Sequence, residues 1–117
     1  MNPEIKTLWT SALRSGKYKK NKGHLAYQAK NGSRKFCCLG VLCDLYIQEH
    51  PENKWSEPNF NELSFLGNRH VLPVEVQRWA GLADENPNVN NGQSLAHHND
   101  FRGLTFRAIA DLIDTSF

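Results

Sequence analysis

The segment from Leu39 to His50 constrains the fold most, because its apolar residues would occupy nearly every side of a helix. A helix with this pattern is usually buried on several sides, so we expect it to be the central element of the fold. Gly40 permits close packing or the close approach of a ligand. Pro51 marks the end of the helix. The apolar positions are Leu39, Val41, Leu42, Cys43, Leu45, Tyr46 and Ile47.

Other helices are predicted from single apolar stripes. The first begins after a cap at Asn2 and ends near Gly16. A short one begins at Pro73 and ends before Gly81, residues 94–99 form about one helical turn, and the last begins after a cap at Thr105. The stripe of the first helix is Ile5, Leu8, Trp9, Ala12 and Leu13, and that of the last is Phe106, Ile109, Ala110 and Ile113.

A β-hairpin is predicted between the first helix and the central one. Residues 24–29 alternate in polarity, Asn31-Gly32 is a strong turn signal, and residues 34–38 form the returning strand. The polar connection from Pro51 to His70 is long enough to hold a second short hairpin. Its expected anchors are Trp55, Phe60, Phe65 and Leu66. We therefore predict an α+β fold, a small antiparallel hairpin or sheet packed against three to four helices in a single domain, 1–117.

The charges are strongly sorted along the chain. Nine basic residues and no acidic residue lie between Ile5 and Cys43, whereas Asp44 to Phe117 holds eleven acidic and five basic residues. A positive face of this kind attracts anions over several ångströms. It indicates a partner such as a phosphate-bearing ligand, nucleic acid or an acidic protein, although a solvated basic edge has the same pattern.

Size and cysteine content point to a cytoplasmic protein. A chain of 117 residues suits one domain with a real core. Its three cysteines, two of them adjacent, make a poor disulfide framework, which favours a reducing compartment. The start of the chain lacks a signal-peptide pattern, and no apolar run is long enough to span a bilayer.

The basic loop and the hairpin supply the first candidate site. Cations interleaved with aromatic rings suit a nucleotide-like ligand. Lysine outnumbers arginine there, which favours charge attraction over the bidentate reading of bases. Tyr27 and Phe36 are equally consistent with ordinary core residues of the hairpin. The predicted ligand-binding residues here are Lys17, Tyr18, Lys19, Lys22, His24, Arg34 and Lys35.

The start of the central helix supplies a second candidate. Free N–H groups at Cys38 and Gly40 would bind an anion. A cysteine at this position can also have a lowered pKa and act as a nucleophile with a histidine, although buried cysteine is the commoner case. Adjacent Cys37 and Cys38 lack the spacing of zinc ligands, so no metal or other cofactor is expected.

The segment from Ser94 to Gly103 is a third candidate. Asn99, Asp100 and Arg102 precede the last helix and would either bind a ligand or form turns with their own backbone.

Several pieces of the chain resemble a small family of uncharacterised proteins of tailed phages. They are Leu13 to Tyr18, Phe36 to Leu45, Leu72 to Leu82, Leu95 to Asp100 and Thr105 to Asp111, of which Cys-Cys-Leu-Gly-Val-Leu-Cys-Asp is the most distinctive. The resemblance implies a phage protein in the cytoplasm of an infected cell. By analogy with phage proteins that counter host defence, it suggests a non-enzymatic protein that sequesters a nucleotide-derived immune signal.

The expected partner is thus a phosphate-bearing small molecule, such as a cyclic nucleotide or an ADP-ribose-like compound, and a homodimer is one arrangement that would build a site for it. The alternatives are an interaction protein for an acidic host protein or nucleic acid, and a cysteine–histidine hydrolase. No membrane partner is expected.

Overall fold

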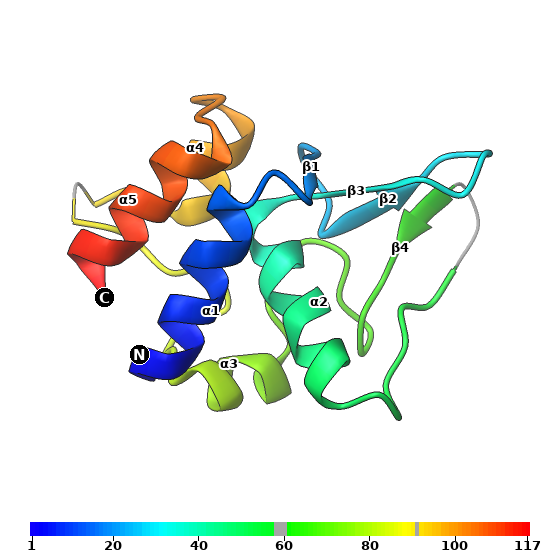
Figure 1. The fold of residues 1–117 in the computed structure, drawn as a ribbon, viewed down its shortest axis with the longest axis horizontal. Helices are drawn as coiled ribbons and strands as arrows, with labels where there is room; N and C mark the ends of the chain where they lie inside the picture. The colour runs from blue at the N-terminus through cyan, green and yellow to red at the C-terminus, as the bar shows by residue number, and fades with distance from the viewer. Residues whose placement is uncertain (58–60, 91) are drawn as a thin grey trace.

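The central helix of the computed structural model is α2 (Cys38–Glu49), which lies between the other helices and the sheet (Figure 1). The structure describes residues 1–57, 61–90 and 92–117. Within these ranges it contains five helices and four strands, which confirms the α+β class. The other helices are α1 (Pro3–Arg14), α3 (Val74–Ala80), α4 (Leu95–Asp100) and α5 (Phe106–Ser116). The strands are β1 (Lys19–Lys20), β2 (Ala26–Gln28), β3 (Arg34–Phe36) and β4 (Glu62–Leu63).

The core forms where α1 packs between α5 and α2 (Figure 1). Trp9 of α1 is fully buried, and its Nε1 donates a hydrogen bond to the Cys38 carbonyl at 3.0 Å. Gly40 is required by close packing, because a Cβ at this position would collide with the Leu25 carbonyl. The start of α2 is therefore pressed directly against the chain that leads into β2.

The sheet has the order β1-β3-β2-β4 and is mixed. The predicted hairpin is present as the antiparallel pair β2–β3, with Tyr27 opposite Lys35, and β4 pairs antiparallel with β2. The sheet is not wholly antiparallel, because β1 runs parallel to β3, with Lys19 beside Lys35. A two-residue strand of lysines has no alternation that a pattern search detects, and charged residues are common on sheet edges.

The connection after α2 contains part of the second hairpin that the sequence suggested. Ser56 forms an antiparallel bridge with Ser64, the residue directly after β4. Trp55 and Phe65 are both buried, with ring centroids 5.7 Å apart. The expected anchor Leu66 is instead 41% exposed. The expected anchor Phe60 lies outside the described residues.

No helix within the described ranges combines the length and the apolar character that crossing a membrane requires.

Candidate anion-binding site

The basic loop and the segment before α5, predicted separately, meet in the structure. The Asn99 side-chain amide donates to the Asn21 carbonyl at 2.8 Å, and the Gly23 N–H donates to Asp100 Oδ1 at 3.0 Å. The Lys20 ammonium donates to the Leu104 carbonyl at 2.6 Å. Residues 17–23 are thus fastened to residues 99–104, so two of the three candidate segments share one surface.

Asn99 is a structural link at this junction. It is fully buried, and its Oδ1 accepts a hydrogen bond from the Cys38 N–H at 3.2 Å. Its amide nitrogen also donates to Asp100 Oδ1 at 2.8 Å, in addition to Asn21. Because both of its polar atoms are engaged, we correct the expectation that Asn99 contacts a ligand. Asp100 is similarly committed to Asn99 and Gly23.

The start of α2 is closed to an anion. Cys38 is fully buried, Gly40 is buried as well, and the Gly40 N–H donates to Cys37 Sγ at 3.4 Å. The Asn99 side chain takes the place that an anion would occupy on the Cys38 N–H. The prediction of open backbone donors at Cys38 and Gly40 is therefore corrected: protein atoms already satisfy them.

The three thiols lack the properties of nucleophiles. Cys37, Cys38 and Cys43 are all buried. Burial raises the pKa of Cys37 to about 12 and raises the pKa values of Cys38 and Cys43 well above the usual value. A buried, protonated thiol is inert at neutral pH. Over the residues that the structure describes, no group of three or more His, Cys, Asp or Glu side chains is arranged to hold a metal ion.

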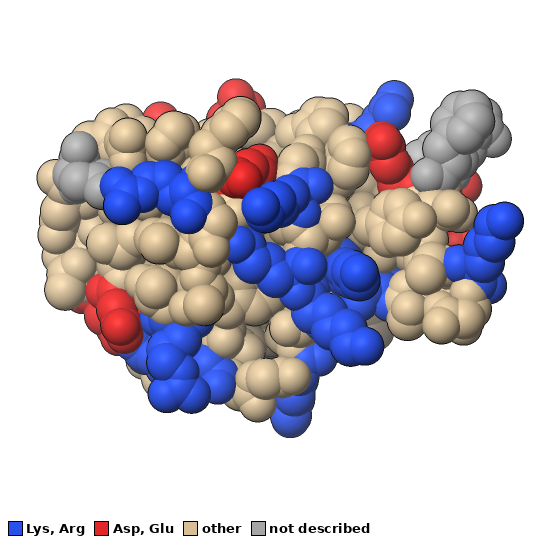
Figure 2. All heavy atoms as spheres, turned by 90° about the horizontal axis from the view of Figure 1, so that it is seen from above, with Lys and Arg blue, Asp and Glu red and all other residues tan. Residues whose placement is uncertain are grey.

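Four exposed lysines form the surface that we call the lysine face: Lys17, Lys19, Lys22 and Lys35. Lys19 and Lys35 are register partners on neighbouring strands, so their side chains leave the sheet on the same side. A Cβ added at Gly103 would lie 3.9 Å from Lys22 Nζ. The Lys22 ammonium group therefore lies over the turn before α5. None of the four pairs with a carboxylate in the described part of the chain. Figure 2 shows Lys and Arg side chains gathered across the middle of one face.

Two further residues near this face were not among the predicted ligand-binding residues. Phe101 is 82% exposed, the most exposed large apolar side chain of the described residues, and its ring centroid lies 5.5 Å from that of His97. Lys20 is half-buried, and burial followed by the charge of Lys22 lowers its pKa. The signal for Phe101 was present in the sequence, because it belongs to no apolar stripe and stands between two charged residues.

Tyr18 lies beside the lysine face but is held by a polar network. Its hydroxyl donates to Asp44 Oδ2 at 2.6 Å, and Gln48 Nε2 donates to both of these groups. Burial, followed by the hydrogen bond to Asp44, raises its pKa. Trp55 Nε1 donates to the other Asp44 oxygen at 3.1 Å. One edge of a hollow of about 380 Å³ is formed by Lys17, Tyr18 and Gln48, and its other walls are Leu8, Ser11, Ala12, Ser15 and Leu45.

The side chains of His24 and Arg34 lie beside carboxylates and are not part of the lysine face. His24 Nε2 lies 3.2 Å from Glu62 Oε1, and its ring centroid is 5.1 Å from that of His70. Arg34 lies 3.7 Å from Glu57 and donates to Gln28 at 2.8 Å. These partners reduce the net attraction of either residue for an anion.

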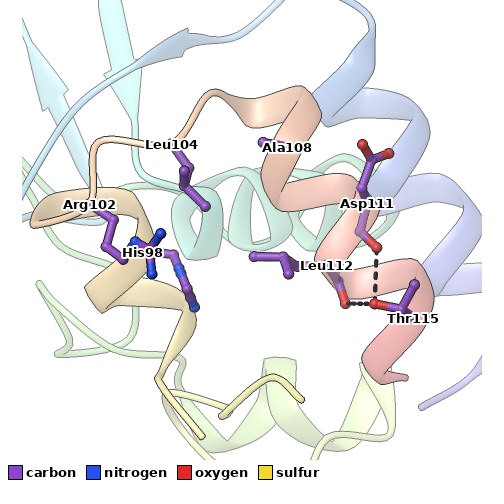
Figure 3. A pocket seen from close by; sticks show the side chains of 7 residues that line it. All are labelled: His98, Arg102, Leu104, Ala108, Asp111, Leu112 and Thr115. Atoms are coloured by element: carbon purple, nitrogen blue, oxygen red, sulfur yellow. Dashed lines mark hydrogen bonds between the residues drawn. The ribbon is translucent and has the colours of Figure 1, made fainter. Parts of the chain in front are cut away.

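Arg102 lines a separate hollow of about 360 Å³ between α4 and α5, shown in Figure 3. His98 and Arg102 come from the α4 side, and Leu104, Ala108 and Leu112 form the apolar wall. Asp111 and Thr115 complete the lining. Burial, followed by the charges of Arg102 and His97, lowers the pKa of His98, so this ring is neutral at neutral pH.

Comparison with known proteins identifies a family but no activity. No curated protein and no solved structure matches the chain. One family model, described as a domain of unknown function, matches residues 1–117. Because this match covers the whole chain, the protein belongs to the family DUF8296.

Proposed function

We propose that this protein is a non-enzymatic binding protein for single-stranded nucleic acid, which it engages through the lysine face and Phe101. The observation that carries the proposal is the combination of four exposed, carboxylate-free lysines with the exposed ring of Phe101, whose neighbours Asp100 and Gly103 lie beside Gly23 and Lys22. Proteins that bind single strands without sequence preference combine a basic surface, which follows the phosphates, with aromatic rings, on which bases stack.

The spread of the lysines favours a long anion over a compact one. They occupy the loop after α1, β1, the turn before β2, and β3, and they do not converge on one enclosed pocket. The hollow at Lys17 contains a single lysine, and the hollow at Arg102 contains a single arginine. A row of exposed ammonium groups is matched by successive phosphates of a chain.

A small phosphate-bearing molecule is the second candidate, favoured by the hollow at Lys17 and Tyr18. Its volume of about 380 Å³ is within the range of ligand pockets. Its hydroxyl groups, amide, ring and ammonium would suit a nucleotide. Sequestration of a nucleotide-derived immune signal in a phage-infected cell stays a prediction that is attached to this candidate.

Fluorescence anisotropy with a labelled oligo-dT or oligo-U of about 15 nucleotides tests the first candidate. Each lysine that neutralises a phosphate contributes about −0.7 to the slope of log K against log salt concentration. Four such contacts predict a slope of about −3. A flat salt response, or no binding at about 50 mM salt, would contradict the proposal.

The variant with Lys17, Lys19 and Lys22 replaced by Ala should bind at least about tenfold more weakly and have a slope of about −1. Its matched control replaces Lys54, Arg78 and Arg107 by Ala, which removes three exposed charges outside the lysine face. Equal weakening by both triple variants would mean that net charge, and not this face, drives binding.

Thermal unfolding with cyclic dinucleotides and cyclic ADP-ribose isomers tests the second candidate. A ligand that binds the folded state raises its stability by mass action, so a rise of about 2 °C or more at large excess is expected for the right molecule. The same rise in a variant with Lys17 replaced by Ala would place that molecule outside the hollow.

A further inference from the structure

The hollow between α4 and α5 has the composition of a small-molecule site. Its volume of about 360 Å³ is within the range of known ligand pockets, which are mainly apolar with a few polar groups. In Figure 3, Leu104 points into the hollow from the linker, and Leu112 reaches towards His98 from the opposite wall. An apolar ligand body would therefore contact side chains on both sides.

Hydrogen bonds hold the walls of this hollow in place. The Leu104 N–H donates to the His98 carbonyl at 3.1 Å, and the Leu104 carbonyl accepts from Lys20 at 2.6 Å. The Thr115 hydroxyl is bonded to the carbonyls of Asp111 and Leu112. The linker and the α5 wall are thus fixed without a ligand, and a preformed site loses little entropy on binding.

The hollow is lined by one arginine and one acid, which differ in whether an opposite charge already engages them. Arg102 is exposed and has no carboxylate partner among the described residues, and it lies beside the ring of His98. Asp111, the one acid in the lining, is bonded to Arg14 at 2.7 Å, and Figure 3 shows its carboxylate turned away from His98. The polar end of a bound molecule therefore meets a cation.

We propose that this hollow binds a small amphipathic anion, with its ring or short chain between Leu104, Ala108 and Leu112 and its carboxylate or phosphate on Arg102. The ligand is distinct from the nucleic acid proposed for the lysine face, because its apolar part would lie against Leu104, Ala108 and Leu112. Arg102 supplies two parallel N–H donors, which match either of the two head groups.

Matched probes test both parts of the proposal. Octanoate and 2-naphthoate carry the anionic head, and octan-1-ol and 2-naphthylmethanol have the same apolar bodies without the charge. The readout is the shift of the Leu104 and Leu112 methyl signals in carbon–proton NMR spectra. We expect the better carboxylate to bind with a Kd on the order of 1 mM or tighter. We expect it to bind at least about tenfold more tightly than its alcohol.

Two variants separate the head-group contact from the apolar contact. Arg102→Gln should reduce the preference for carboxylate over alcohol to about onefold, whereas Arg107→Gln, an exposed arginine outside the lining, should retain it. Ala108→Phe should fill the hollow and abolish binding of both probes. Thermal unfolding shows whether each variant is folded, and Arg102→Gln alters only an exposed side chain.

Two results would overturn the proposal: no shift of the Leu104 and Leu112 methyl signals with any saturating probe, or equal binding of acid and alcohol. Oligonucleotide binding is measured in parallel on Ala108→Phe. Retained oligonucleotide binding with loss of probe binding is the expected result, and it makes the two sites independent.

Discussion

The lysine face and the start of α2 lie within one short stretch of chain, and both have the sequence features of an anion site. They differ in whether their donors are already used. The ammonium groups of Lys17, Lys19, Lys22 and Lys35 face solvent without carboxylate partners in the described structure. The N–H groups of Cys38 and Gly40 are buried and bonded to Asn99 and Cys37. A donor recruits a ligand only while it is exposed and unsatisfied.

Gly40→Ala should have the largest effect on the buried start of α2. The added Cβ meets the Leu25 carbonyl, so α2 and the chain entering β2 have to separate. We expect a loss of about 3 kcal/mol or more in the free energy of unfolding, because the backbone atoms of Leu25 cannot rotate away from the added Cβ as a flexible side chain could. Urea denaturation measures it. A loss below about 1 kcal/mol would mean that the two segments are not in rigid contact.

Alkaline pH tests the burial of the thiols at the same place. The folded-state pKa of Cys37 is raised from 9.0 to about 12, so the folded protein holds this proton more tightly than the unfolded chain. This stabilisation is complete below pH 9 and is lost as pH rises through the folded pKa. Cys37 alone predicts a loss of about 3 kcal/mol by about pH 11. Urea denaturation across this range should show a shallower pH dependence for Cys37→Ala.

Asn99→Ala removes the link between the two regions. The Cys38 N–H and the Asn21 carbonyl lose their partner in a buried setting, so we expect a loss of about 2 kcal/mol in the free energy of unfolding. The control is Asn88→Ala, at an exposed position, which should change stability by less than about 0.5 kcal/mol. Similar losses for both variants in chemical denaturation would contradict the structural role of Asn99.

Phe101→Ala tests whether a base stacks on the exposed ring beside the lysine face. If a base stacks on this ring, its removal should weaken binding of a single-stranded oligonucleotide by about 1–2 kcal/mol and leave folding intact. Anisotropy titrations at constant salt measure the change. Val74 is also exposed, at 50%, but lies on α3, so Val74→Ala should bind like the parent protein. Unchanged binding by Phe101→Ala would remove stacking from the proposal.

Lys19→Ala has the smallest expected effect. Stability should change by less than about 0.5 kcal/mol, because the side chain is exposed and unpaired. The salt slope of oligonucleotide binding should become less steep by about 0.7. Arg34 is the informative comparison, because it already faces Glu57, and Arg34→Ala should alter the slope less than Lys19→Ala does. The opposite order would shift the site towards the tip of the hairpin.

Short-range patterns predicted most of the secondary structure. The cap at Asn2, the stripe containing Trp9 and the turn at Asn31-Gly32 each involve residues that are close in sequence, and all three features are present. The same reasoning missed β1, because two lysines have no periodicity. It placed Leu66 in the interior because hydrophobicity alone does not report the positive φ of 50° that this residue adopts in an exposed turn.

The candidate site was predictable as a set of charges but not as a surface. Nine basic residues and no acidic residue between Ile5 and Cys43 are visible in the sequence. Only the tertiary structure distinguishes Lys19, which is exposed and unpaired, from His24 and Arg34, which face Glu62 and Glu57. These carboxylates belong to the acidic part of the chain, so the pairing depends on how the two parts fold together.

The sequence by itself determined the class of fold, the central apolar helix and the sign of the N-terminal charge, because each depends on residue type and local spacing. The tertiary structure decided which donors remain available. Asn99 reaches the Cys38 N–H across 61 positions, and Lys20 reaches the Leu104 carbonyl across 84. Contacts at this range form only when the whole chain closes, and no local pattern records which polar groups they will satisfy.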